Sequence, residues 1–189
     1  MPKIKFDEDT HTYTLNGEKI PSVSQVLRKV LYADKFKFVN EEVLEKASEF
    51  GTMVHRALET GFSDPLTRLE EEVYQKAIRI REENFIVDMM KEQQIYSSLG
   101  YAGTLDGYAL VMGEKAIIDY KTTSVFDKEY VSWQLSLYAN ALEEQGYQVA
   151  KLYGIHIPKR GKGKLIEVAR KSKIEIEWLI KKWRENGIN

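Results

Sequence analysis

The chain has 189 residues, of which 43% are hydrophobic and 30% charged, and its formal net charge is −1. This length suffices for one domain with a substantial core, and the lack of cysteine excludes disulfides, thiolate zinc sites, iron–sulfur clusters and cysteine nucleophiles. The near-neutral charge argues against a protein that coats DNA non-specifically, but not against an enzyme whose metal-binding carboxylates offset its lysines. No apolar run reaches the roughly 20 residues of a membrane span, so we expect a cytoplasmic protein without membrane contact.

Hydrophobic periodicity and capping residues predict helices that alternate with small groups of strands. Helices are expected over residues 22–31, from 40 onward, 67–81, 127–145 and from 172 onward. Strands are expected over residues 12–15, 18–20, 91–97, 149–157 and 165–169, and in both arms of a hairpin over 103–121. The order is therefore hairpin, helices, three strands, helix, two strands, helix, which favours a mixed α/β or α+β core.

Two short signals define the beginning of the chain. Asn16-Gly17 is the favoured pair for a two-residue turn between strands, because both positions need positive φ. Pro21 ends this small hairpin, and Ser22 or Ser24 can cap the helix that follows.

A glycine interrupts the apolar face of the helix that begins near residue 40. Glycine inside a helix costs about 1 kcal/mol relative to alanine, so Gly51 indicates that another part of the chain approaches the backbone closely. His55 lies four residues later on the same side, and Glu59 four beyond that. His11 and His156 lack any partner pattern and are expected to be structural.

The hairpin over residues 103–121 carries charges that its packing does not require. Asp106 lies on the first arm, and Asp119-Tyr120-Lys121 ends the second arm after a buried-strand pattern. Isolated charges are costly to bury unless they are paired or bound to metal. Alternation places Asp119 and Lys121 on one face and Tyr120 on the other. The alternative is a surface Asp–Lys pair, which fits an isolated triplet better than one that follows a buried strand.

This arrangement suits hydrolysis of a phosphodiester. Carboxylate and carbonyl oxygens are preferred ligands of hard divalent cations, and such ions assist phosphoryl chemistry. Asp106 and Asp119 can converge on one site across the hairpin, and the Tyr120 carbonyl can add a further ligand. Lys121 would then lie beside the metal, where it can orient water or stabilise phosphate charge.

Three further groups are candidates for the same site. Glu92, on the strand before the hairpin, is either another metal ligand or a surface charge. Gln134 and Tyr138 share a helix face at i, i+4 spacing, and they either face the site or are ordinary helix residues. A basic, glycine-rich turn either contacts phosphate or is a solvated hairpin tip; its charged residues are Lys159, Arg160, Lys162 and Lys164.

Four motifs in this order resemble the RecB-like branch of the PD-(D/E)XK nuclease superfamily. They are Gly51-x-x-x-His55, Gly103-x-x-Asp106, Asp119-x-Lys121 and Gln134-x-x-x-Tyr138. The resemblance runs from about residue 45 to 157. The leader from Tyr13 to Val23 is also similar to that of phage and prophage exonucleases of this branch and of mitochondrial genome maintenance exonucleases. The motif that names the superfamily has proline at the position of Leu105. It has aspartate or glutamate at the position of Asp119.

The resemblance implies a restriction-endonuclease-like core, with a central mixed β-sheet flanked by helices, in a single domain over residues 1–189. Residues 1–38 would be a hairpin-and-helix appendage, 40–170 the catalytic core and 172–189 a C-terminal helix. Several relatives hold an iron–sulfur cluster with four cysteines, which this chain lacks.

The resemblance also assigns roles. It implies that one or two Mg²⁺ or Mn²⁺ ions are held by a set of ligands comprising His55, Asp106, Asp119 and the Tyr120 carbonyl. Lys121 would be the catalytic lysine, and Gln134 and Tyr138 would hold this lysine or a substrate phosphate.

The expected activity is a Mg²⁺-dependent deoxyribonuclease, first of all an exonuclease on single-stranded or end-exposed DNA in recombination, repair or phage DNA processing. A structure- or sequence-specific endonuclease and a non-catalytic DNA-binding module are the alternatives. DNA is the expected partner, and a homo-oligomer or a recombination or helicase partner is left open. The motifs do not fix strand polarity or the choice of DNA over RNA, because loops around a fold select the substrate.

Overall fold

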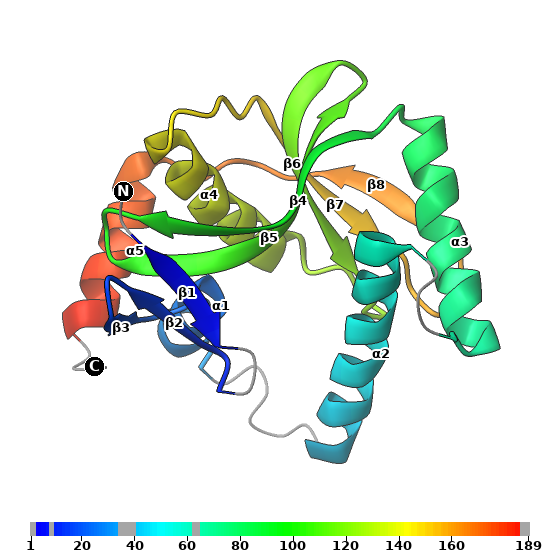
Figure 1. Ribbon diagram of the computed structural model, residues 1–189, viewed down its shortest axis with the longest axis horizontal. Coiled ribbons are helices and arrows are strands. Elements are labelled where there is room, and N and C mark those ends of the chain that lie inside the picture. The colour runs from blue at the N-terminus through cyan, green and yellow to red at the C-terminus, as the bar shows by residue number, and fades with distance from the viewer. Residues whose placement is uncertain (1–2, 8–9, 34–40, 62–64, 186–189) are drawn as a thin grey trace.

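The computed structural model describes residues 3–7, 10–33, 41–61 and 65–185 (Figure 1). Its strands are β1 Ile4–Asp7, β2 Thr12–Leu15, β3 Glu18–Ile20, β4 Val87–Ser97, β5 Tyr101–Val111, β6 Glu114–Lys121, β7 Lys151–His156 and β8 Lys164–Glu167. Its helices are α1 Val23–Val30, α2 Glu41–Thr60, α3 Arg68–Glu83, α4 Lys128–Glu144 and α5 Lys173–Glu185. None of the helices within these ranges combines the length and hydropathy needed to cross a membrane.

The strands form two sheets. A five-stranded sheet has the order β4-β5-β6-β7-β8, in which only β6 and β7 are parallel, and β1, β2 and β3 form a separate antiparallel sheet. The parallel pair is connected through α4, as parallel strands require a crossover. The predicted α/β class, with a mixed central sheet flanked by helices, is confirmed.

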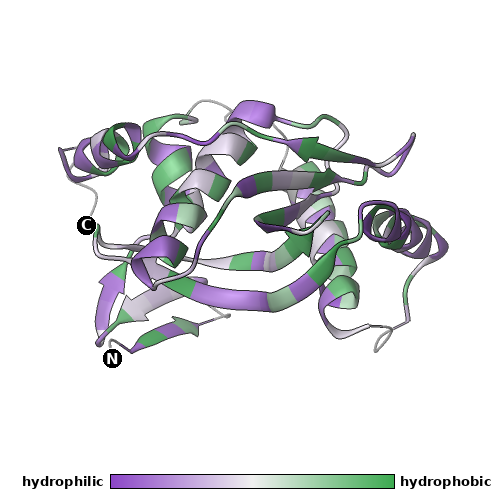
Figure 2. Cartoon of the chain, turned by 90° about the horizontal axis from the view of Figure 1, so that it is seen from above, coloured by the Kyte–Doolittle hydropathy of each residue, from purple (hydrophilic) through white to green (hydrophobic). Residues whose placement is uncertain are grey.

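Helices cover both faces of the five-stranded sheet (Figure 1). On one face α1, α4 and α5 build what we call the first core, and on the other α2 and α3 build the second core. Neighbouring residues of β6 divide between the two, since Ile117 belongs to the first core and Ile118 to the second, as strand alternation requires. In Figure 2 both the strands and the helices mix hydrophobic with hydrophilic residues, and the hydrophobic segments of the strands are short.

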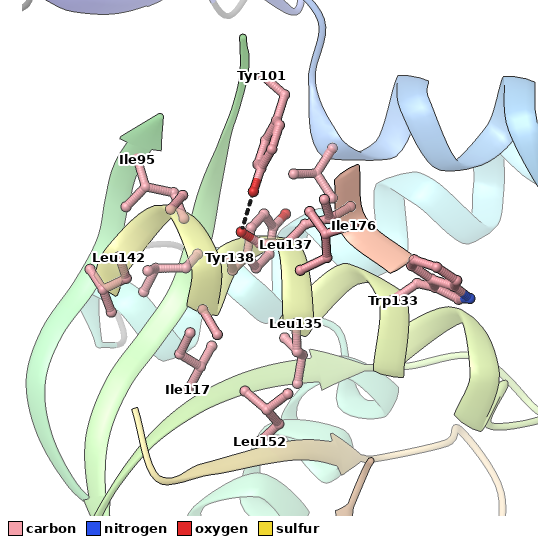
Figure 3. Close-up of a cluster of buried hydrophobic side chains, with 14 of the residues drawn as sticks. Ile95, Tyr101, Ile117, Trp133, Leu135, Leu137, Tyr138, Leu142, Leu152 and Ile176 are labelled. Carbon is pink, nitrogen blue, oxygen red and sulfur yellow. Dashed lines mark hydrogen bonds between the residues drawn. The ribbon is translucent and has the colours of Figure 1, made fainter. Parts of the chain in front are cut away.

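Helix α4 is the central element of the first core, with eleven buried residues. Figure 3 shows its leucines packed among side chains from the sheet and α5, and the Tyr101 hydroxyl donating a hydrogen bond to the Leu137 carbonyl at 2.9 Å. Asp127 caps the helix by accepting from Tyr130 N at 2.9 Å. A helix that is buried on most of its circumference holds its site-facing residues rigidly.

The predicted turns and caps are largely confirmed. Asn16 and Gly17 have φ of 53° and 92°, and Ser22, rather than Ser24, caps α1 in a capping box with Gln25. The turn between β5 and β6 is shorter than the four residues expected, because only Met112 and Gly113 lie outside the strands. The predicted start of α2 at residue 40 lies outside the described residues.

Two strand segments differ from the prediction. β1 was not expected at all, and β4 begins at Val87 rather than at residue 91. The first half of β4 contains an irregularity between Asp88 and Met90, where the register with β5 shifts. This bulge obscures the simple alternation by which a strand is identified.

Candidate metal centre

The candidate site lies where β5 and β6 separate. Their backbone pairing runs from Val111 opposite Glu114 to Gly107 opposite Ile118 and then stops. At that point the Asp106 Oδ2 atom accepts a hydrogen bond from Tyr120 N at 2.7 Å. A side-chain carboxylate therefore satisfies a backbone donor where the strand pairing ends.

At Asp106 the side chains of β5 switch from one face of the sheet to the other. Leu105 belongs to the first core, whereas a Cβ atom on Gly107 would lie 2.7 Å from Ile118 Cγ1 in the second core. Residues two apart on a regular strand point to the same face, so the strand is irregular between them. This irregularity places a charged residue at the edge of both cores.

Helix α2 supplies the histidine. His55 Nδ1 lies 3.4 Å from Asp106 Oδ2, and His55 Nε2 lies 3.0 Å from the Tyr120 carbonyl oxygen. One turn earlier, a Cβ atom on Gly51 would lie 3.4 Å from Thr122 Oγ1, so the predicted close approach is to the segment directly after β6. The helix therefore rests against the end of β6, with its histidine over the strand opening.

Glu92 completes a three-residue group. Its neighbours Lys91 and Gln93 pair with Gly107 and Leu105, which places it opposite Asp106. Its φ of 44° is left-handed, a conformation that costs a non-glycine residue on the order of 1–3 kcal/mol. His55, Glu92 and Asp106 each offer a ligand atom within 4.8 Å of the others, so this group could hold a metal ion.

The three side chains perturb one another's protonation. Burial alone would lower the pKa of His55, but the adjacent Asp106 carboxylate raises it to about 9. Burial would raise the pKa of Asp106, yet His55 and Lys121 hold it below its ordinary value. Burial and the negative charge of Asp106 raise the pKa of Glu92 to about 7. Crowded, desolvated carboxylates of this kind are stabilised by a nearby cation.

Asp119 and Lys121 form a buried ion pair beside this group. Asp119 Oδ2 lies 2.7 Å from Lys121 Nζ, with side-chain exposures of 2% and 21%. Tyr120, between them, packs into the second core, as alternation predicted. Asp119 is not a member of the three-residue group, so its role as a ligand stays a prediction.

Burial and the ion pair also shift the pKa values of Asp119 and Lys121. Burial raises the pKa of Asp119 to about 6 against the opposing effect of Lys121. Burial would lower the pKa of Lys121, but the carboxylates of Asp119 and Asp106 raise it above its ordinary value. Lys121 is therefore a cation at neutral pH, which suits it to stabilise negative charge rather than to accept a proton.

Helix α4 presents the predicted glutamine and tyrosine to the other side of the strand opening. Both are buried, and Gln134 Nε2 donates to the Tyr138 hydroxyl at 3.3 Å. Gln134 Oε1 is buried without a hydrogen-bond partner among the described residues. A Cβ atom on Gly103 would lie only 2.6 Å from Tyr138 Cε1, so the glycine makes room for the tyrosine ring against β5.

A polar network behind the site was not anticipated. Arg81 Nη1 donates to the Tyr120 hydroxyl at 2.6 Å, and Arg81 Nη2 donates to Asp88 Oδ2 at 2.7 Å. Lys91 Nζ lies 3.4 Å from the same Asp88 oxygen. These residues and the metal-capable group line a common small pocket, together with Leu58 and Glu59. The network fixes the Tyr120 side chain, and so steadies the backbone whose carbonyl meets His55.

The basic turn lies between β7 and β8, with Lys164 as the first residue of β8, and the side chains of Lys159, Arg160, Lys162 and Lys164 are exposed. Lys159 Nζ lies 4.0 Å from the centroid of the Phe50 ring on α2. Lys76 holds the turn by donating to the carbonyls of Pro158 and Lys159 at 2.9 and 3.2 Å. The turn is thus anchored beside the helix that carries His55, and its phosphate-contacting role stays a prediction.

The two remaining histidines have structural contacts. The rings of His11 and Phe6 pack edge to face, with centroids 5.1 Å apart. His156 Nε2 lies 2.7 Å from the Thr123 carbonyl oxygen.

No protein-family model matches this sequence, and a search of curated proteins finds no match.

Proposed function

We propose that this protein is a metal-dependent deoxyribonuclease whose metal site is built around His55, Glu92 and Asp106. The observation that carries the proposal is the convergence of these three ligands beside the buried Asp119–Lys121 pair. A structural role explains none of this well, because three carboxylates, an imidazole and an ammonium group are costly to desolvate together.

The donor set fits a hard divalent cation such as Mg²⁺ or Mn²⁺. Carboxylates and a backbone carbonyl are the ligands that these ions prefer, and His55 would add one nitrogen donor. The negative charge of Asp106 disfavours the ionised form of Glu92, and a bound cation would reverse that preference. Asp119 would complete the ligand set, for one or two ions. When bound, such an ion stabilises developing charge on phosphate and lowers the pKa of water.

The chain's own residues supply the rest of the chemistry. Lys121, protonated and held by Asp119, would donate to a phosphate oxygen and stabilise charge that grows during hydrolysis. Gln134, whose Oε1 is buried without a hydrogen-bond partner among the described residues, would accept from the lysine or from water. Tyr138, fixed against Gly103, would limit the room on the α4 side. These roles require pre-organised groups, which packed helices and strands provide.

The same proposal places the protein in the RecB-like branch, with a restriction-endonuclease-like core. Support comes from where the four motifs lie. They fall on α2, β5, β6 and α4, and all four elements meet at the separation of β5 and β6. Motifs that are distant in sequence and share one locus argue for a common function.

An exonuclease on single-stranded or end-exposed DNA is the primary form of the proposal. Labelled linear and circular DNA would be incubated with the protein in Mg²⁺, Mn²⁺ or EDTA, with Lys121→Met as the matched variant. Degradation of linear DNA alone supports an exonuclease, and nicked circles support an endonuclease. If no metal supports cleavage by the wild type, the catalytic proposal fails. Equal DNA binding by the variant would then favour the non-catalytic module.

A further inference from the structure

The basic turn concentrates positive charge in a chain whose net charge is −1. Its side chains Lys159, Arg160, Lys162 and Lys164 are exposed, and residues 145–166 include no aspartate or glutamate. Lys151, earlier on β7, lies 2.8 Å from Glu167 through its Nζ atom. In the part of the chain that the structure describes, no carboxylate forms such an ion pair with the four side chains of the turn. Their charge is therefore not neutralised.

The basic turn begins beside the lysine of the proposed site. β6 and β7 run parallel, with Lys121 opposite His156, and Ile157 N donates to the Lys121 carbonyl at 2.8 Å. Lys159 follows only two residues after this bond. Because the carboxyl ends of neighbouring parallel strands lie at one edge of a sheet, the turn continues the edge at which Lys121 ends β6.

The turn also contacts the helix that carries His55. Lys159 Nζ lies 4.0 Å from the centroid of the Phe50 ring. Phe50 precedes His55 by five residues on α2, which is about 7.5 Å along the helix axis. The turn is thus a close neighbour of the metal-capable group.

Contacts with α3 hold the backbone of the turn in place. Lys76 Nζ donates to two carbonyls of the turn at 2.9 and 3.2 Å. A Cβ atom on Gly163 would lie 2.7 Å from Ile80 Cδ1 and 3.2 Å from the His156 carbonyl oxygen, so the turn packs closely on α3 at this point. A fixed backbone lowers the entropic cost of binding a ligand at its side chains.

The backbone of a nucleic-acid strand fits this surface better than a single small anion does. Positive side chains that are exposed and follow one another along a turn match the repeating phosphates of a strand, whereas a single anion is held by groups that converge on it. Lys121 adds to the series. Burial would lower its pKa, but the carboxylates of Asp119 and Asp106 raise it, so it is a cation at the same edge of the sheet.

We propose that the basic turn binds the phosphates of a DNA strand that neighbour the phosphate at Lys121, with Arg160 and Lys162 as the principal contacts. The inference rests on the proposed nuclease function and gives its substrate a path, from Lys121 across the end of β7 to the turn. Contacts to phosphate position a strand and carry no sequence information. The turn should therefore hold DNA of any sequence, with an affinity that depends on salt.

Binding in EDTA tests the turn without requiring catalysis. Fluorescence anisotropy would measure the affinity for a labelled oligothymidylate from about 50 to about 300 mM salt. The test variants are Arg160→Gln and Lys162→Gln, singly and together. The matched controls are Lys115→Gln and Lys173→Gln, singly and together, since both lysines are exposed. Lys115 lies at the opposite end of β6 from Lys121, and Lys173 begins α5 on the other face of the sheet.

Each phosphate contact contributes about 0.7 to the slope of log affinity against log salt for a single strand. Each single turn variant should therefore lose about 0.7 of this slope and bind about fivefold more weakly at about 0.1 M salt. The double turn variant should lose about twice the slope and bind about 25-fold more weakly. The control variants should keep the slope and affinity of the wild type. Melting temperatures of all variants check that the fold is retained.

Turn variants with the slope of the wild type would overturn the inference. The same holds for control variants that lose as much affinity as the turn variants, and for a wild type without affinity for the oligonucleotide. Metal-dependent cleavage judges the nuclease separately, because salt-dependent binding at the turn without cleavage supports the turn and removes only the catalytic proposal.

Discussion

Replacing His55 by glutamine should remove a pH dependence from the stability of the metal-free protein. The pKa of His55 is raised from 6.5 to about 9, chiefly because the Asp106 carboxylate outweighs the effect of burial. A folded-state pKa above the unfolded value stabilises the protein fully below pH 6.5, and this contribution is lost as the pH rises through 9. At about 1.4 kcal/mol per pKa unit, the histidine contributes at most about 3 kcal/mol.

Urea unfolding in EDTA at about pH 7.5 and about pH 9.5 gives the measurement, because about 2 kcal/mol of the contribution of His55 is lost between these values. The pKa values of Glu92 and Asp119 are raised to about 7 and about 6. Their effect on the free energy of unfolding therefore changes mainly below pH 7.5. The wild type should therefore lose about 2 kcal/mol of unfolding free energy that His55→Gln does not lose.

The comparison uses the change with pH, so any constant destabilisation by the substitution cancels. NMR titration adds a direct reading, since the chain has three histidines and the variant identifies the resonance of His55. Equal losses in both proteins, or a His55 resonance that titrates near pH 6.5, would refute the proposed pairing with Asp106.

Three other outcomes follow from the same geometry. Calorimetric Mn²⁺ affinity should increase from pH 7 to 9, because the metal competes with the proton on His55; a flat profile argues against a histidine ligand. Lys121→Met should keep Mn²⁺ binding but lose about 10²-fold or more in DNA cleavage, and full activity in single-turnover assays would contradict its role beside Asp119. Gly103→Ala should cost about 1–3 kcal/mol in urea unfolding, since its Cβ would meet the Tyr138 ring at 2.6 Å. The cost should be smaller in a Tyr138→Leu background, and an equal cost there would show that another contact is responsible.

The central hairpin could be predicted because its signals are local. The apolar pattern of β6 marks a buried strand, and Met112 and Gly113 take the positive φ values of 49° and 86° that a two-residue turn needs. Helix α4 likewise begins and ends near residues that cap helices, Asp127 and Gly146. Elements whose boundaries depend on adjacent residues are those that sequence patterns describe well.

β1 and the beginning of β4 could not be predicted in the same way. β1 has four residues and exists through its pairing with β2, from Ile4 opposite Leu15 to Asp7 opposite Thr12. The β4 segment from Val87 contains a bulge against β5. Strand stability depends on cross-strand neighbours, and these neighbours are distant in sequence.

The site was predictable in part. Spacing and order made His55 and Asp106 candidates, and the structure brings both into the group that could hold a metal ion, but Glu92 was left between a ligand and a surface charge. Its place in the group depends on a left-handed backbone at an irregular point of β4, which the sequence pattern does not indicate. The network from Arg81 to Tyr120 also had no local signal.

Cleavage of end-labelled single-stranded linear DNA is the most direct test of the central claim. The protein should degrade this substrate in Mg²⁺ or Mn²⁺, lose the activity in EDTA and regain it when metal is restored. Asp106→Asn and Glu92→Gln, folded as judged by melting temperature, should each lose about 10²-fold or more in rate. Cleavage that persists in EDTA or in both variants, or a wild type that leaves DNA intact with either metal, would contradict the assignment of this site to metal-assisted phosphodiester hydrolysis.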